Sequence, residues 1–154
     1  MLRIIADSTC DISKEDARKM GIQIVPISVR FGNEEFLDGV EITHEEFYTR
    51  LAECDELPKT SQPSPDTFMK VFNEAVAAGD DVLGIFISSD LSGTYQSACL
   101  AALDVEEETG KKLYMVDSRS ASIGTALLIR EAVKTTKLHK LVVIYRGAEM
   151  VACE

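Results

Sequence analysis

The chain has 154 residues, of which 45% are hydrophobic and 27% charged, and its formal net charge is −10. This length suffices for one hydrophobic core and is short for two well-built domains. The acidic charge argues against binding to nucleic acid or to anionic membrane surfaces, because both require a basic surface. No apolar run approaches the roughly 20 residues of a transmembrane helix, and the first residues lack a signal-peptide core. We therefore expect a cytoplasmic protein.

The sequence shows no metal or cofactor motif. The four cysteines (Cys10, Cys54, Cys99 and Cys153) fall in no metal-binding or redox spacing, so reduced thiols are expected. The acidic residues are scattered along expected helix surfaces, and the glycine-rich motifs that hold nucleotide phosphates are absent. We expect neither a bound metal nor a cofactor.

The first part of the chain predicts a strand, a short helix and a hairpin. Residues 2–6 form an apolar strand, and residues 13–21 have the hydroxyl cap and the terminal glycine of a helix. Residues 22–38 are a broken extended run around Pro26, followed by a Gly-Asn turn and a returning segment. Because proline disfavours a central strand, this run indicates a hairpin or an excursion at a sheet edge.

Two capped helices and a proline-rich loop follow. The pattern of residues 43–46 is a capping box, which begins a helix that runs to about Cys54. The expected apolar face of this helix consists of Phe47, Tyr48 and Leu51. Residues 57–65 contain three prolines and should form a stiff loop. Ser64 then caps a helix that ends at Gly79, with Pro65 at its first position. Its expected buried face consists of Phe68, Phe72, Ala75 and Val76.

The stretch from residue 82 to 103 is the most informative. Residues 82–87 form an apolar run that suits a strand buried on both faces. Small hydroxyl residues follow, and a helix is expected from Gly93 to about Leu103 with Ser92 as its N-cap. Exposed N–H groups and the positive end of the helix dipole favour an anion at such a junction.

Strands alternate with helices along the chain. A second strand–helix unit is expected over residues 112–134, and residues 141–145 could form one more strand. The expected apolar positions of the two long helices include Leu103, Ile123 and Leu127. We predict an α/β fold, with a mostly parallel sheet and helices on both faces. Three predicted strands end in small polar residues: Asp7-Ser8, Ser88-Ser89 and Asp117-Ser118. Ligands bind outside the carboxyl ends of such strands, so this edge is the expected site.

Five residues near this edge supply neutral hydrogen-bond donors: Thr60, Ser61, Ser92, Gly93 and Thr94. Hydroxyl and N–H groups can hold a carboxylate without burying a fixed positive charge. Such a set suits a ligand with one small anionic end and a large apolar remainder. From their spacing alone, the same residues could instead only cap helices and turns.

Serine-based catalysis is a further alternative. Ser92 lies at a strand-to-helix turn, where a nucleophile elbow would place its serine, but the Leu-Ser-Gly context lacks the Gly-x-Ser-x-Gly frame. The chain has two histidines, His44 and His139, and both are expected at the surface. Since no base is evident for the serine, we expect no enzymatic activity.

The sequence resembles the DegV family of bacterial fatty-acid-binding proteins. The resemblance rests on four motifs: Asp7-Ser8-Thr9, residues 60–65 (TSQPSP), residues 88–97 (SSDLSGTYQS) and Val116-Asp117-Ser118. It covers about residues 2–133. It implies that residues 1–135 form the amino-terminal DegV domain, that residues 136–154 form a divergent tail, and that the family's second domain is missing.

The resemblance also implies a function. Family members bind a long-chain fatty acid, and the FakB-type members present its carboxylate to a partner kinase, which forms acyl phosphate for phospholipid synthesis. By motif match, Thr60 and Ser92 would contact the carboxylate. The alternative is a truncated domain that folds without binding lipid and dimerises through the surface left by the missing domain.

Overall fold

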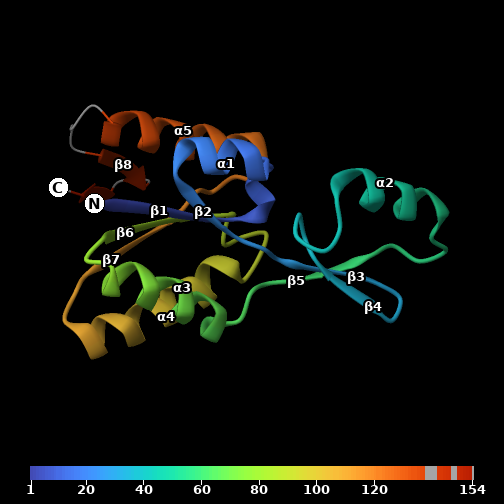
Figure 1. The fold of residues 1–154 in the computed structure, drawn as a ribbon, viewed down its shortest axis with the longest axis horizontal. Coiled ribbons are helices and arrows are strands. Elements are labelled where there is room, and N and C mark those ends of the chain that lie inside the picture. The colour runs from blue at the N-terminus through green and yellow to red at the C-terminus, as the bar shows by residue number, and fades with distance from the viewer. Residues whose placement is uncertain (138–141, 147–148, 154) are drawn as a thin grey trace.

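The computed structural model describes residues 1–137, 142–146 and 149–153. Its centre is a four-stranded parallel sheet with the strand order β2-β1-β6-β7 (Figure 1). The strands are β1 (Leu2–Asp7), β2 (Ile22–Val25), β6 (Asp81–Phe86) and β7 (Leu113–Asp117). All four run in the same direction, so their carboxyl ends lie at one edge of the sheet.

Helices cover both faces of this sheet, as Figure 1 shows. One face carries α1 (Lys14–Met20) and α5 (Ile123–Lys137), and the other carries α3 (Pro65–Ala77) and α4 (Thr94–Thr109). A single-turn 3-10 helix, η1 (Ser8–Cys10), follows β1. The predicted α/β class with a mostly parallel sheet is therefore confirmed.

Each face of the sheet has its own apolar core. Ile4 and Ile129 belong to the core under α1 and α5, whereas Ile5 belongs to the core under α3 and α4. Successive strand residues point to opposite faces, which explains why β1 is apolar without alternation. In the second core, the ring of Phe68 stacks on that of Phe72, with 5.8 Å between the ring centroids, and meets the ring of Phe86 edge-on, with 5.2 Å between the centroids.

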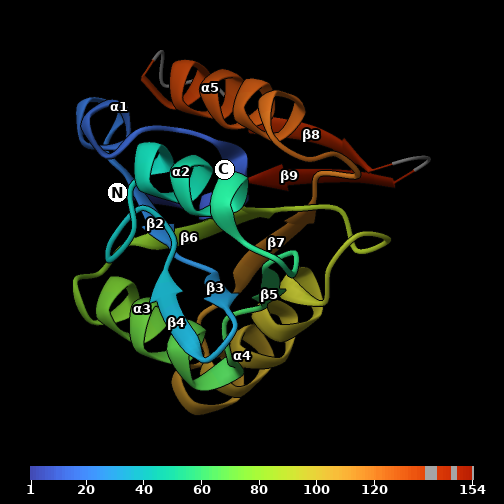
Figure 2. The same cartoon turned by 90° about the vertical axis from the view of Figure 1, so that its right-hand side faces the viewer.

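A smaller lobe, which we call the arm (residues 28–61), projects beyond the carboxyl edge of the sheet (Figures 1 and 2). It consists of an antiparallel sheet in the order β4-β3-β5 and the helix α2 (His44–Glu53). The strands are β3 (Ser28–Phe31), β4 (Glu34–Leu37) and β5 (Lys59–Ser61). Val29, Phe31 and Ile42 form the arm's own small core. We call the rest of the described α/β layers the body.

The hairpin and the helix caps agree with prediction in most places. β3 and β4 form the expected hairpin, and β2 is the outer strand on its side of the parallel sheet. Thr43 and Glu46 make the expected capping box, and Ser64 caps α3. The proline-rich loop differs from prediction because residues 59–61 pair with β3 as a strand.

Four further predictions about helices were wrong. The N-cap of α4 is Gly93 and not Ser92, and α4 continues to Thr109 rather than ending near Leu103. Ile123 and Leu127 on α5 are 71% and 62% exposed, and Leu103 is exposed as well. The apolar face expected on α2 is also only partly covered, since Tyr48 is 67% exposed.

At the carboxyl end of the chain, β8 (Val142–Arg146) pairs with β9 (Glu149–Cys153) in an antiparallel hairpin. The sequence predicted the first of these strands and missed the second. His139 and Leu141 lie outside the described residues. α5 extends to Lys137, and the division of the chain after residue 135 stays a prediction.

Candidate functional site

The ends of β1 and β6 are joined by the buried carboxylate of Asp7. One oxygen of Asp7 accepts the backbone N–H of Ile87 at 2.9 Å, and the other accepts the backbone N–H of Thr9 at 3.0 Å and the Thr9 hydroxyl. Burial raises the pKa of Asp7, while the hydrogen bonds from Thr9 and Ile87 act in the opposite direction. Asp7 therefore holds two segments of the carboxyl edge in fixed positions.

A second carboxylate makes a similar connection between β6 and β7. Asp117 accepts the Ser89 hydroxyl at 2.5 Å and the Ser89 backbone N–H at 3.2 Å. The backbone N–H of Arg119 donates to the same carboxylate at 2.9 Å. The polar residues at the ends of β1, β6 and β7 thus meet at one edge, as the strand pattern predicted.

A cavity of about 300 Å³, which we call the hydroxyl pocket, opens where the arm meets this edge. Four of the five predicted donor residues line it: Thr60, Ser61, Ser92 and Gly93. Thr60 and Ser61 come from β5 of the arm, whereas Ser92 and Gly93 come from the loop before α4 of the body. The other lining residues are Thr9, Ile27, Gln62, Ile87 and Leu91.

The fifth predicted donor, Thr94, lies behind the pocket and is completely buried. Its hydroxyl is 2.9 Å from the Ser92 hydroxyl, and its backbone N–H donates to Ser92 Oγ at 3.3 Å. When Ser92 accepts from Thr94, the Ser92 proton is available to a ligand in the pocket. Thr94 is placed to orient Ser92 rather than to line the cavity.

Gly93 leaves room for the close approach of the Gln62 side chain. A Cβ atom at residue 93 would lie 2.0 Å from Gln62 Oε1, far below any contact distance. The other end of the same amide donates to the hydroxyl of the buried Ser97 at 2.8 Å. Gln62 therefore links the arm side of the pocket to α4, a role that the sequence analysis missed.

A second cavity of about 480 Å³, the middle cavity, shares the lining residues Thr9, Ile27 and Thr60 with the hydroxyl pocket. Its other walls combine apolar and aromatic side chains with a few charged ones: Asp11, Val29, Asp38, His44, Phe47, Tyr48, Ala121 and Ser122. The shared residues place the two cavities next to each other. The hydroxyl pocket thus continues into a more apolar space.

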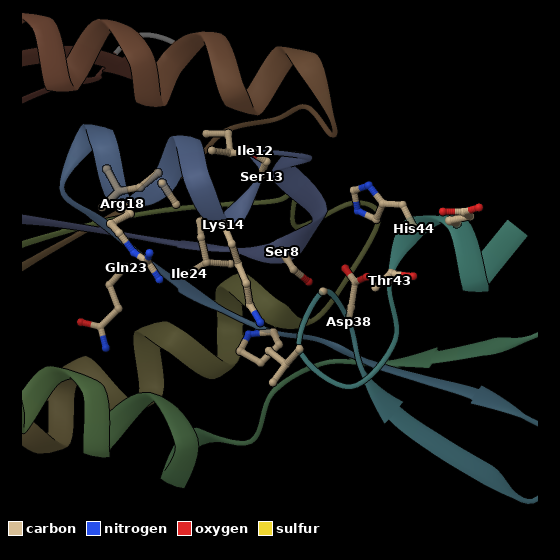
Figure 3. Close-up of a pocket in the computed structure, with 16 residues that line it drawn as sticks. Ser8, Ile12, Ser13, Lys14, Arg18, Gln23, Ile24, Asp38, Thr43 and His44 are labelled. Carbon is tan, nitrogen blue, oxygen red and sulfur yellow. The ribbon is translucent and has the colours of Figure 1, made fainter.

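A third cavity, of about 750 Å³, lies between α1 and the loop before α2 (Figure 3). Its lining includes Lys14 and Arg18 of α1, apolar residues such as Ile24, and Asp38 and His44 on the arm side. Figure 3 shows Asp38 and His44 at the arm end and Arg18 beside Gln23 at the opposite end. All three cavities lie along the junction of arm and body. They depend on how the two lobes meet, so the sequence indicated the donor residues of the hydroxyl pocket but neither of the other two cavities.

The hydroxyl pocket is lined by neutral residues. None of its nine lining residues is titratable, so the lining itself supplies no general base for Ser92. His44 lines the middle cavity instead.

Within the described part of the chain, no cluster of three histidine, cysteine or acidic residues could hold a metal ion. No helix among these residues combines the length and apolar character of a membrane crossing.

Comparison with known proteins agrees with this architecture. The profile of the DegV family matches residues 1–140. A DegV domain-containing protein from Clostridium perfringens is 41% identical over 133 residues, which are 86% of this chain and 47% of that protein. The chain therefore spans about half the length of the curated relatives that it matches.

Solved structures show the same relationship. A stearic acid-binding protein from Eubacterium ventriosum superposes with a TM-score of 0.85 at 37% identity, over 91% of this chain and 49% of its own. A fatty-acid-binding DegV family protein from Thermus thermophilus gives a TM-score of 0.80 at 34% identity, over 90% of this chain and 48% of its own. With its fold, its strand-end motifs and its family match in agreement, the chain belongs to the DegV family.

Proposed function

We propose that this chain binds a long-chain fatty acid, with the head group in the hydroxyl pocket and the acyl chain along the middle cavity. The proposal rests on hydrogen-bond donors that are distant in sequence and meet in one cavity. The hydroxyl pocket is lined by Thr60 and Ser61 of the arm and by Ser92 and Gly93 of the body, about thirty residues further along the chain. This pocket adjoins the more apolar middle cavity.

The head group would be held by neutral donors. The hydroxyls of Thr60, Ser61 and Ser92 and the backbone N–H of Gly93 can each donate to a carboxyl oxygen, and Thr94 supports Ser92 from behind. Hydrogen bonds to a charged group contribute about 1.5–3 kcal/mol each. Such donors are enough to orient a head group at the edge of the sheet.

The acyl chain would supply most of the affinity. Each buried methylene contributes about 0.8 kcal/mol, so a long chain outweighs the head group. Val29, Phe47 and Tyr48 provide an apolar wall that begins where Thr60 ends the hydroxyl pocket. Related DegV proteins are described as binding fatty acids, which supports this assignment.

Presentation of the bound acid to a kinase for acyl-phosphate formation belongs to the same proposal, as does a cytoplasmic location. The domain division after residue 135 is also part of it. In this view the chain is a carrier, and the phosphoryl-transfer chemistry belongs to the partner.

A second candidate is a lipid-free domain that pairs with another copy of itself. The exposed apolar side chains favour it, because Leu91, Ile123 and Leu127 are each more than 60% exposed at or near the carboxyl edge. Contiguous exposed apolar surface is typical of interaction sites. Light scattering distinguishes this candidate, since it requires a dimer without lipid.

The test is native mass spectrometry of the purified chain, followed by titration with oleate. We expect bound fatty acid, and we expect Ser92→Ala to weaken oleate binding about tenfold through the loss of one charged hydrogen bond. Ser64→Ala is the matched control, because it removes the cap of α3 outside all three cavities. The proposal would be refuted if the purified chain carried no fatty acid and did not bind added oleate. It would also be refuted if Ser92→Ala and Ser64→Ala bound oleate with equal affinity.

A further inference from the structure

Thr9 differs from the other hydroxyl residues of the hydroxyl pocket because its hydroxyl proton is already used in a hydrogen bond within the protein. It lines both the hydroxyl pocket and the middle cavity, at the point where the two adjoin. Its hydroxyl donates to Asp7, and its backbone N–H donates to the same carboxylate oxygen at 3.0 Å. A hydroxyl whose single proton is used in this way keeps only lone pairs for other partners.

The surroundings of Asp7 support the assignment of the Thr9 hydroxyl as a donor to this carboxylate. Asp7 is completely buried, and its second oxygen accepts the backbone N–H of Ile87 at 2.9 Å. In its ionised form Asp7 has no proton to give and can only accept from Thr9. The three groups that hydrogen-bond to this carboxylate all donate, and the Thr9 hydroxyl cannot turn its proton toward the cavity without leaving the carboxylate one donor short.

We propose that Thr9 is a specificity-determining residue that accepts a hydrogen bond from the ligand's head group. This inference rests on the proposed fatty-acid binding and adds the chemical form of the head group. With donors at Ser92 and Gly93 and an acceptor at Thr9, the hydroxyl pocket is complementary to a group that has both a carbonyl oxygen and an O–H or N–H. A protonated carboxylic acid or a primary amide on a long acyl chain has this pattern.

An ester head group fits less well. A methyl ester has a carbonyl oxygen but no O–H or N–H to donate to Thr9. The Thr9 acceptor then gains no partner, which is the situation in which polar sites discriminate most strongly. The hydroxyl pocket should therefore rank a primary amide above an ester of the same chain.

The experiment compares three ligands with one acyl chain: hexadecanoic acid, hexadecanamide and methyl hexadecanoate. Because the chains are identical, the apolar contribution cancels in every ratio. Dissociation constants are measured for the full chain, for Thr9→Val and for Thr9→Ser at one pH of about 8, above the ordinary carboxyl range. Val has nearly the shape of Thr without the hydroxyl, and Ser keeps the hydroxyl.

We expect the unmodified chain to bind the amide about tenfold more tightly than the ester. Thr9→Val should reduce this ratio to within about twofold, and Thr9→Ser should restore it. Equal binding of amide and ester by the unmodified chain would overturn the inference even where Thr9→Val fails to fold. A ratio that Thr9→Val leaves unchanged would overturn it as well.

The outcome also separates this inference from the proposed function. Binding of hexadecanoic acid that weakens in Ser92→Ala, together with ratios insensitive to Thr9, would refute only the role of Thr9. Failure of all three ligands to bind would refute the proposed function, and the role of Thr9 with it.

Discussion

The backbone N–H of Ile87 donates a hydrogen bond of 2.9 Å to the buried carboxylate of Asp7. This bond connects the last residue of β1 to the residue that follows β6, across two neighbouring strands of the sheet. Ile87 and Thr9 both line the hydroxyl pocket, and both donate to Asp7. One buried acid therefore fixes two walls of the candidate site.

Asp7 should make the stability of the chain depend on pH. Because burial raises its pKa in the folded chain, the folded state binds this proton more tightly than the unfolded state does. The contribution of Asp7 to the free energy of unfolding is thus largest below the ordinary carboxyl pKa of about 4 and declines as pH rises through the raised pKa. In Asp7→Asn an amide replaces the carboxyl group, and because the amide does not titrate in this range, this contribution to the pH dependence is removed.

Urea unfolding of both chains over a series of pH values measures this effect. The free energy of unfolding of the unmodified chain, minus that of Asp7→Asn, should fall from about pH 4 upward and then level off. A difference that grows with pH over the same range would contradict the direction of the shift. Asp66→Asn on the exposed start of α3 is a suitable control.

Gly93→Ala should distort the hydroxyl pocket more than it destabilises the fold. The new Cβ would meet the amide of Gln62 at 2.0 Å, and this exposed, flexible side chain can move aside at the cost of its bond to Ser97. We expect a loss of about 1 kcal/mol in stability and a clear loss of oleate affinity.

The double variant Gly93→Ala with Gln62→Ala tests the cause of that loss. Removal of the Gln62 amide relieves the clash, so the double variant should bind oleate no more weakly than Gln62→Ala alone. Thermal unfolding and oleate titration of all three variants give the comparison. An additive loss in the double variant would show that Gly93 acts through something other than Gln62.

Much of the body follows from local chemistry in the sequence. The caps at Thr43 and Ser64 are hydrogen bonds between residues three apart, so a short motif contains all the information. The apolar run of β6 likewise predicts a strand buried on both faces, and Asp7 and Asp117 at the strand ends predict the edge where they meet.

The arm and its junction with the body depend on contacts that are distant in sequence. β5 has three exposed residues in a proline-rich segment, and only its pairing with β3 makes it a strand. Serine is a common N-cap residue, but the Ser92 hydroxyl oxygen accepts the backbone N–H of Thr94, and α4 begins one residue later than expected. Leu103 and Leu127 are apolar but lie on the exposed sides of α4 and α5, whose buried sides include small residues such as Ala101 and Ala126.

Two aromatic residues should respond very differently to truncation. Phe68 is completely buried against Phe72 and Phe86, so Phe68→Ala should lower the free energy of unfolding by about 3–5 kcal/mol. Tyr48 is 67% exposed, so Tyr48→Ala should change it by about 0.5 kcal/mol or less. Tyr48 lines the middle cavity, so its truncation should instead weaken binding of the acyl chain. Urea unfolding gives the first comparison, and equal losses in the two variants would contradict the described core.

The thiol of Cys10 should be inert while the chain is folded. It is completely buried, and burial is the main cause that raises the pKa of this thiol to about 11; the carboxylates of Asp7 and Asp11 act in the same direction, while the backbone hydrogen bond with Ile12 acts against them. Since the thiolate is the reactive form, iodoacetamide at pH 8 should leave Cys10 unmodified while it reaches the half-buried Cys54 and Cys99. Peptide mapping by mass spectrometry identifies the alkylated residues, and the chain unfolded in urea is the control in which Cys10 should react. Alkylation of Cys10 at the same rate in both states would mean that β1 and η1 do not bury this residue as described.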